Sequence, residues 1–218
     1  TDDIYNVERT AGELGERWEL LGIGLKFYST CRSKHSTIDT LRRFRQEHPE
    51  INPDDVKKIR VGTTSITHKY SVNADAITSV VAAQLSHPYV CAVTMLEGNA
   101  FVDQFNEEKI RDQRILEYAK KVEVYPDEEI ENLPRNLRYT VKVQIELNDG
   151  RVFNLRTEYP KGHPLNPFTE EELLWKFDSL AGKVFDCADR RKKIVDAVMH
   201  LEDLDNVKVL TNLLRKEA

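Results

Sequence analysis

The order of hydrophobic and polar residues at the start of the chain predicts a helix and then a strand. Leu14, Trp18 and Leu21 recur at spacings of four and three, which is typical of an amphipathic helix over about residues 6–21. Residues 23–27 then alternate between apolar and small or polar side chains, as a half-buried strand does.

The period changes again near His35, where a second helix is predicted to begin. Apolar residues recur every three positions from Ile38 to Phe44, and arginines avoid that side. The free amides and the dipole at a helix N-terminus favour an anion. Because Lys26 and Cys31 gather before the same helix end, the pattern indicates a carboxylate site there.

The middle of the chain predicts both strands and helices. Residues 55–64 and 120–125 have strand patterns. Residues 73–98 indicate a helix, a break at His87-Pro88 and a second helix that ends at Gly98 as its C-cap.

A hairpin is predicted where residues 138–147 and 151–158 flank Asn148-Asp149-Gly150. A two-residue loop would pair Ile145 with a polar residue, whereas a three-residue loop pairs Ile145 with Phe153. The second register buries one coherent face, so we expect a bulged hairpin with Gly150 at positive φ.

The last part of the chain reads as helical after a loop rich in Pro and Gly. Thr169 and Glu172 form a capping box for a helix that reaches about Phe185. Two further helices are expected over about residues 186–201 and 206–214.

This order of elements predicts an α+β fold, with a small antiparallel or mixed sheet packed by helices and a helical appendage. We divide the chain into an N-terminal helical segment, an α+β domain and a C-terminal helical segment, at residues 1–20, 21–168 and 169–218.

Composition and net charge indicate which classes of binding partner are expected. With 40% hydrophobic and 32% charged residues, the chain is expected to be globular. A net charge of -5 argues against nucleic acid as a partner, because binding to phosphates needs a basic surface. No apolar run approaches the length that spans a bilayer, so no membrane partner is expected.

The cysteines and the first residues of the chain indicate the cellular compartment. Cys31, Cys91 and Cys187 are odd in number and widely spaced, which predicts neither a disulfide framework nor a zinc site. The polar, acidic start is unlike a signal or transit peptide. We therefore expect a cytoplasmic protein.

General signatures of metal or nucleophile chemistry are missing from the sequence, including HExxH, GxSxG, the P-loop and GxGxxG. We expect no cofactor and no metal, which leaves acid–base chemistry or binding. Each candidate also has a plain structural interpretation: Lys26 as a surface lysine, Cys31 as a small apolar residue, His35 as a helix cap and Tyr89 as a core residue bonded to the backbone.

Four segments, taken together and in order, resemble one family. "LKFYSTCRSKHSTID" is similar to the K-x-Y-P-x-C-x-x-x-H-x-x-I-D segment of the MmgE/PrpD superfamily. "AAQLSHPYVCAVTMLEG" is similar to its A-x-F-S-x-P-Y segment, and "YPKGHPLNPFTEEELLWKF" to its G-x-P-x-N-P-L-T segment. "LEDLDNVKVLTNLL" resembles its C-terminal helix.

The resemblance implies a partial protein. Members are about twice as long and have a large helical domain followed by a smaller α+β lid, and this chain resembles the lid with the closing helices. It also implies that an N-terminal helical domain or a separate subunit is a partner, and that a homodimer or hetero-oligomer forms.

Carried over by position, Lys26 matches a lysine that contacts a substrate carboxylate, and Tyr89 matches a tyrosine that faces the cleft. These two are the predicted catalytic residues. Cys31 and His35 match positions that line or support the same cleft, so we expect them to be substrate-binding. Ser29 and His87 depart from the family pattern, where Pro and an apolar residue are usual.

The family's reactions share the transfer of a proton next to a carboxylate without a metal or organic cofactor. We therefore expect the lid portion of a lyase acting on a small di- or tricarboxylic acid, with a 2-methylcitrate dehydratase-like hydro-lyase as first choice and decarboxylase or epimerase as alternatives. The chain is expected to be inactive on its own. A non-catalytic carboxylate-binding or assembly subunit, or a plain structural domain, is the rival hypothesis.

Overall fold

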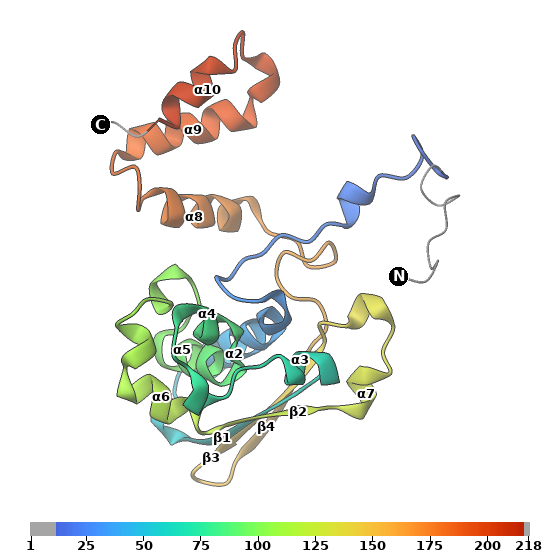
Figure 1. Cartoon of the computed structure of the whole chain (residues 1–218), viewed down its shortest axis with the longest axis vertical. Coiled ribbons are helices and arrows are strands. Elements are labelled where there is room, and N and C mark those ends of the chain that lie inside the picture. The colour runs from blue at the N-terminus through green and yellow to red at the C-terminus, as the bar shows by residue number, and fades with distance from the viewer. Residues whose placement is uncertain (1–11, 216–218) are drawn as a thin grey trace. The chain divides into compact units, whose positions relative to one another are not determined.

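The computed structural model describes residues 12–215, which divide into two compact units, the first up to Pro167 and the second from Phe168 (Figure 1). The first unit holds the sheet and most helices, and the second is all helical. The helices of the first unit are α2 His35–Glu47, α3 Ser65–Lys69, α4 Val80–Leu85, α5 His87–Glu97, α6 Gln113–Ala119 and α7 Glu128–Glu131. Its strands are β1 Val56–Thr63, β2 Val122–Pro126, β3 Val141–Leu147 and β4 Val152–Thr157.

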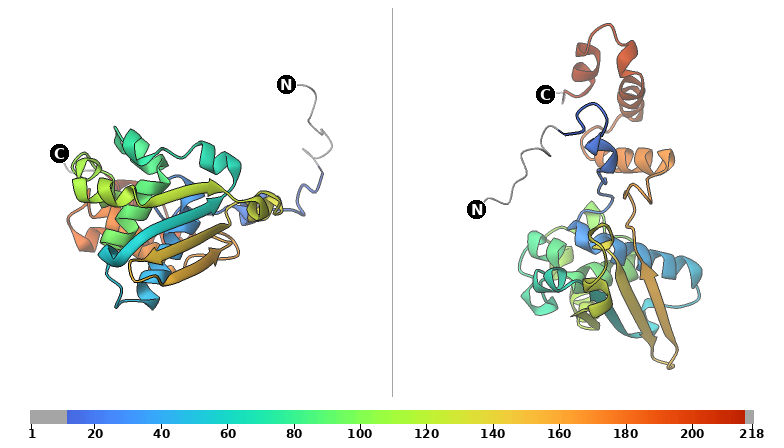
Figure 2. Two further views of the ribbon diagram at one scale, coloured as in Figure 1. Left: turned by 90° about the horizontal axis from the view of Figure 1, so that it is seen from below. Right: turned by 90° about the vertical axis from the view of Figure 1, so that its right-hand side faces the viewer.

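The four strands form one mixed sheet in the order β2-β1-β3-β4 (Figure 2). β1 and β2 are parallel, and the connection between them contains α3 to α6. β1 pairs with β3, and β3 with β4, in antiparallel fashion. A mixed sheet packed by helices confirms the predicted α+β class.

Register places apolar side chains in rows that cross the whole sheet. Ile59 pairs with Val122 on one side and with Ile145 on the other, and Ile145 pairs with Phe153. Ile59 and Ile145 are fully buried. Because side chains alternate between the two faces of a sheet, this row covers one face only.

Helices cover that apolar face. α2 packs against β3 and β4, while α5 packs against β2, α2 and α6. The apolar side of α2 is buried as predicted, from Ile38 to Phe44. The Phe44 ring meets the Phe153 ring edge to face at 5.1 Å between centroids, which joins the helix to the edge strand.

The opposite face of the sheet carries charged side chains. Glu123 on β2 forms ion pairs with Lys58 at 2.6 Å and with Arg60 at 3.2 Å, and Lys142 on β3 lies 3.1 Å from Asp127. Such exposed pairs add little stability, but they keep this face compatible with water.

The predicted hairpin is confirmed in detail. Ile145 pairs with Phe153, and Gly150 has φ +91°. The break between α4 and α5 is also where the sequence predicts it: the Ser86 hydroxyl accepts from the Tyr89 N–H at 3.2 Å, which caps α5. α5 ends at Gly98 with φ +82°.

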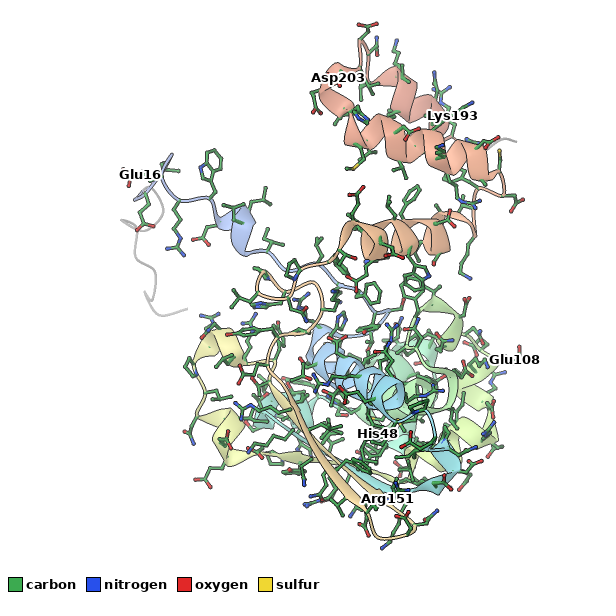
Figure 3. All side chains as sticks on the ribbon, turned by 180° about the vertical axis from the view of Figure 1, so that it is seen from behind. Glu16, His48, Glu108, Arg151, Lys193 and Asp203 are labelled. Carbon is green, nitrogen blue, oxygen red and sulfur yellow. The ribbon has the colours of Figure 1, made fainter. Side chains whose placement is uncertain are left out.

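The second unit consists of α8 Glu170–Ala181, α9 Ala188–Met199 and α10 Lys208–Leu213. The capping box is confirmed, with the Thr169 N–H donating to Glu172 at 2.8 Å and the Glu172 N–H donating to the Thr169 hydroxyl at 3.2 Å. α8 is four residues shorter than predicted, because the chain turns at Gly182. Figure 3 shows side chains on all sides of these helices, including Lys193 on α9.

The prediction for the start of the chain is wrong where the structure describes it. Residues 6–11 of the expected helix lie outside the described residues, and residues 12–21 contain only turns and the start of a 3-10 helix, Glu19–Gly22. The expected strand at 23–27 is absent from the described sheet. An amphipathic pattern needs an apolar surface to pack on, and Trp18 and Ile23 are 68% and 59% exposed.

None of the helices in the described part of the chain has the length and apolarity needed to cross a membrane. Among residues 12–215, no three His, Cys, Asp or Glu side chains come together in a way that could hold a metal ion.

Replacing Gly150 by alanine should lower the free energy of unfolding by about 1 kcal/mol, because an L-residue is strained at positive φ. No atom lies within 4 Å of the position that a Cβ would take, so steric overlap does not contribute. Gly22→Ala is the matched control, since its Cβ position is equally open and its φ is not positive. Urea unfolding of both variants tests this, and equal losses would contradict it.

Candidate functional site

The backbone beside Lys26 is held on both sides, although the Lys26 side chain is exposed. The Leu25 N–H donates to the Gly162 carbonyl at 2.8 Å, and the Arg32 guanidinium donates to the Leu25 carbonyl at 2.6 Å. A Cβ at Gly24 would lie 2.4 Å from Arg32 Nη2, so a larger residue there would displace the guanidinium. Lys26 therefore presents its charge from a fixed segment, not from a strand.

A buried polar cluster anchors the next residues. The Tyr28 hydroxyl donates to one oxygen of Asp39, and the Lys161 N–H donates to the other at 2.7 Å. Arg42 donates to the Tyr28 hydroxyl at 3.3 Å. Burial raises the pKa of Asp39, although these donors and the Arg42 charge oppose the rise.

Cys31, Ser33 and Lys34 form a chain of contacts one turn before α2. The Ser33 hydroxyl lies 3.3 Å from Cys31 Sγ, and Lys34 Nζ donates to the same hydroxyl at 3.2 Å. Cys31 is half-buried, while Lys34 is only 1% exposed. This places a buried ammonium next to a thiol that solvent reaches.

The pKa of the Cys31 thiol is lowered overall. Burial alone would raise it, but the Ser33 hydrogen bonds and the ammonium charges of Lys34 and Lys26 outweigh that effect. The pKa of Lys34 is lowered by burial, and the Cys31 charge opposes this. Because its charge acts on Cys31, Lys26 belongs to the same electrostatic environment.

His35 and His87 lie inside the fold. His35 is the first residue of α2 and fully buried, with its ring edge to face with Tyr28 at 5.2 Å. His87 is also fully buried, and burial together with the Lys34 charge places its pKa well below the usual value. His87 is therefore neutral at pH 7, and the substrate-binding role of His35 stays a prediction.

Tyr89 is fully buried in the first turn of α5. Its hydroxyl donates to the Gln104 carbonyl at 2.7 Å, and its ring lies 5.8 Å from that of Phe105. Burial raises the pKa of Tyr89, so the hydroxyl stays protonated. In this chain the proton of Tyr89 is used by the backbone, and its catalytic role stays a prediction.

The N-terminus of α2 does not offer its amides to solvent. His35, Ser36 and Thr37 in its first turn are all fully buried. The carboxylate site expected at this helix end is therefore not on the surface of the described residues. The accessible positive charge comes from Lys26 instead.

Several residues of the site were not predicted. Lys34 and Asp39 lie within the quoted motif, but nothing in their spacing shows that Lys34 is buried and Asp39 half-buried. His163 is half-buried and next to Gly162, and its Nδ1 accepts the Leu165 N–H at 3.1 Å. The other ring nitrogen therefore carries the proton in the neutral form and can donate it.

Lys26, Cys31 and His163, called the rim below, bring a cation, a thiol of lowered pKa and a donor imidazole onto chain segments that the hydrogen bond from the Leu25 N–H to the Gly162 carbonyl joins. Such groups can hold a carboxylate, and the described residues around them contain no arrangement suited to a metal.

Comparison with known proteins places these features in a family. The MmgE/PrpD C-terminal domain matches residues 28–201. Cis-aconitate decarboxylase of Aspergillus terreus is 28% identical over 96% of this chain and 44% of its own length, and that of Homo sapiens is 29% identical over 88% and 40%. Cis-aconitate decarboxylase of Mus musculus is 31% identical over 61% of the chain and 27% of its length. The chain thus spans less than half the length of these relatives.

The Asp39 cluster makes stability depend on pH. A raised carboxyl pKa means that the native state holds the proton longer than the unfolded state, so stability falls as pH rises from about 4 through the raised value. Asp39→Asn cannot titrate and should lack this fall, at about 1.4 kcal/mol for each pH unit of rise in pKa.

The measurement is urea unfolding of both proteins between pH 4 and pH 8. The stability difference between native protein and Asp39→Asn should be largest in acid and shrink towards pH 7. Asp149→Asn is the control, because Asp149 is exposed and its pKa is lowered by Arg151. A difference for Asp39→Asn that is constant across this range would contradict the assignment.

Proposed function

Because this chain belongs to the MmgE/PrpD family and carries its C-terminal domain, we propose that it is the lid portion of a lyase acting on a small di- or tricarboxylic acid. The observation that carries the proposal is Lys26, an exposed ammonium on a segment fixed at both backbone groups of Leu25. The relatives supply the reaction class.

Decarboxylation is the reaction we place first. Three of the relatives are named cis-aconitate decarboxylase, so an unsaturated tricarboxylate is the substrate class that they favour. The dehydration expected from the sequence, on a 2-methylcitrate-like acid, becomes the second candidate. Epimerisation is the third, and no relative named here supports it.

Both leading reactions build negative charge beside a carboxylate. In decarboxylation the carbon–carbon bond to the departing carboxyl group breaks, its electron pair stays on the substrate, and a substrate carbon then takes a proton. A cation already fixed beside the remaining carboxylate stabilises that charge without having to reorganise. Lys26 is suited to this role, because its segment is held by Gly162 and Arg32.

The other predicted residues have different parts in the proposal. Cys31 lines the rim next to Lys26, and His35 holds the aromatic layer beneath it. Tyr89 would donate a proton only if its hydroxyl exchanged the Gln104 carbonyl for substrate. Its role therefore rests on the family resemblance.

We infer that a further helical domain, in the same protein or in a separate subunit, completes the site. The second unit has a groove of about 610 Å³ whose apolar lining includes Leu174, Phe177 and Met199. The segment before Lys26 is also apolar and exposed, most of all at Leu21. Apolar surface of this extent normally marks an interaction site. A homodimer or hetero-oligomer remains part of the proposal.

A carboxylate-binding or assembly subunit without activity is the alternative. It is favoured by the burial of His35 and His87, because neither imidazole is exposed to act as a base on a bound acid. This alternative predicts binding of tricarboxylates by the complete protein without turnover.

In the complete protein, Lys26→Met should lower kcat/KM for cis-aconitate at least about 100-fold, because a charge aimed at the transition state is lost. Release of carbon dioxide is the readout, and loss of water from 2-methylcitrate is measured in parallel. Lys57→Met is the control, since Lys57 pairs with Glu146 on the sheet, away from the site. Unchanged kcat/KM for Lys26→Met would refute the site, and binding without turnover would favour the alternative.

The native protein that carries this chain should contain more than the 25.3 kDa of these residues, and we expect about twice that mass per assembled site. The reason is the exposed apolar surface of the second unit, which needs a covering domain. Native mass spectrometry, followed by denaturing mass spectrometry of the subunits, distinguishes a longer chain from a second subunit. A lone 25.3 kDa species that is stable and monomeric would contradict the inference.

A further inference from the structure

We propose that Arg32, Arg138 and His163 form an oxyanion-binding site in the first unit, which takes a small molecule with two negative charges. The three side chains come from segments far apart in the sequence. Arg32 lies just before α2, Arg138 just before β3, and His163 in the loop after β4. The proposal does not depend on the reaction proposed above, because it uses neither Lys26 nor Tyr89.

Tyr139 brings the two guanidinium groups together. Arg32 Cζ lies 5.7 Å and Arg138 Cζ 4.8 Å from the centre of its ring. Arg138 also donates to the Tyr139 hydroxyl at 3.1 Å. Because that hydroxyl accepts from Arg138, its own proton is available to a ligand. Planar cations commonly stack on aromatic rings, and here one ring holds two of them.

The backbone fixes Arg32 from another side. Its Nη1 donates to the Leu25 carbonyl at 2.6 Å. Its Nη2 lies against Gly24, where a Cβ would be 2.4 Å from Nη2 and 3.1 Å from the Gly162 carbonyl. Gly162 directly precedes His163, so Arg32 and the loop that carries His163 border the same glycine. Arg32 is thus ordered before any ligand binds, which lowers the entropy cost of binding.

His163 supplies a third donor. Its ring lies on the Tyr159 ring with 4.7 Å between centroids, and its Nδ1 accepts the Leu165 N–H at 3.1 Å. Burial lowers the pKa of His163, and the positive charge of Arg32 acts in the same direction. The imidazole is therefore neutral at pH 7 and carries its proton on Nε2. The charge of the site comes from the two arginines.

These two positive charges have no acidic partner among the described residues. No carboxylate in residues 12–215 forms an ion pair with Arg32, Arg138 or His163. Burial lowers the pKa of Arg32, and the Arg138 charge lowers it further, so the two guanidiniums repel each other. Asp39 offsets this in part from a distance, but both of its oxygens already accept hydrogen bonds. A bound dianion would remove the repulsion.

The donors define the class of ligand. Guanidinium groups bind carboxylates and phosphates through pairs of N–H donors in a fixed plane. A ligand matched to both arginines has several acceptor oxygens and two negative charges, one for each guanidinium. Inorganic phosphate and small polycarboxylic acids share this chemistry. Arg138 is exposed and Arg32 half-buried, so such a ligand can enter from solvent.

The test is equilibrium dialysis of the complete native protein against radiolabelled inorganic phosphate at pH 7.5. We expect saturable binding that sodium chloride weakens, because salt screens an exposed charge such as Arg138. Arg138→Gln should raise the Kd roughly tenfold or more, as expected when a hydrogen bond to a charged group is lost. Tyr139→Phe keeps the ring and removes the hydroxyl, so it should raise the Kd by a smaller factor.

Arg135→Gln is the matched control. Arg135 is exposed, lies three residues before Arg138 on the same segment, and loses the same charge on replacement. It should leave the Kd for phosphate unchanged. The comparison separates a local site from a general effect of net charge.

A competition experiment distinguishes the two kinds of ligand. Tricarballylate, a saturated tricarboxylic acid, is added to the dialysis with labelled phosphate. Displacement by tricarballylate that Arg138→Gln weakens supports the site and identifies polycarboxylic acids as ligands. Phosphate binding that tricarballylate does not displace supports the site for phosphate alone.

Two results would overturn the proposal. The first is the absence of saturable phosphate binding to the native protein. The second is an equal Kd in Arg138→Gln and Arg135→Gln, with thermal unfolding showing that both variants are folded. Loss of the lyase proposal would leave phosphate binding unchanged, so the two proposals fail separately.

Discussion

The half-buried carboxylate of Asp39 is the contact on which the geometry of the site depends. It binds the Tyr28 hydroxyl with one oxygen and the Lys161 N–H with the other. These partners come from three parts of the chain: the segment before α2, α2 itself and the loop after β4. Because Gly162 follows Lys161 and accepts the Leu25 N–H, the same anchor fixes the backbone beside Lys26. Loss of this carboxylate would release the loop and the lysine together.

The sheet positions Asp39 indirectly, by holding the helix that carries it. Its apolar face holds α2 through contacts such as Phe44 with Phe153, and α2 in turn presents Asp39 to the loop. Its other face carries ion pairs and is exposed to water. The reactive side chains lie on irregular segments above the helices, which is where loops on a rigid scaffold commonly place functional residues.

Local patterns in the sequence were enough to predict the parts of the fold that bury their own apolar faces. The hairpin register, the start of α2 and the ends of α5 follow from turn residues and periodicity. Residues 12–25 could not be predicted in the same way, because their apolar side chains stay exposed within the described residues. The residues of the site also fall into predicted and unpredicted ones. Lys26 and Cys31 were found from the motif, whereas the burial of Lys34 and Tyr89 arises from tertiary packing that spacing does not encode.

The protonation states of the buried and half-buried residues indicate which steps of the proposed lyase reaction this chain could support. His35 and His87 are buried, and the Nδ1 lone pair of His163 faces the Leu165 N–H. The Tyr89 hydroxyl is protonated and donates to Gln104. None of these three imidazoles therefore presents a lone pair to solvent that could accept a proton, and the Tyr89 hydroxyl acts as a donor. In the proposed lyase, this portion would stabilise negative charge on a carboxylic acid, and the proton acceptor would come from the further helical domain inferred above.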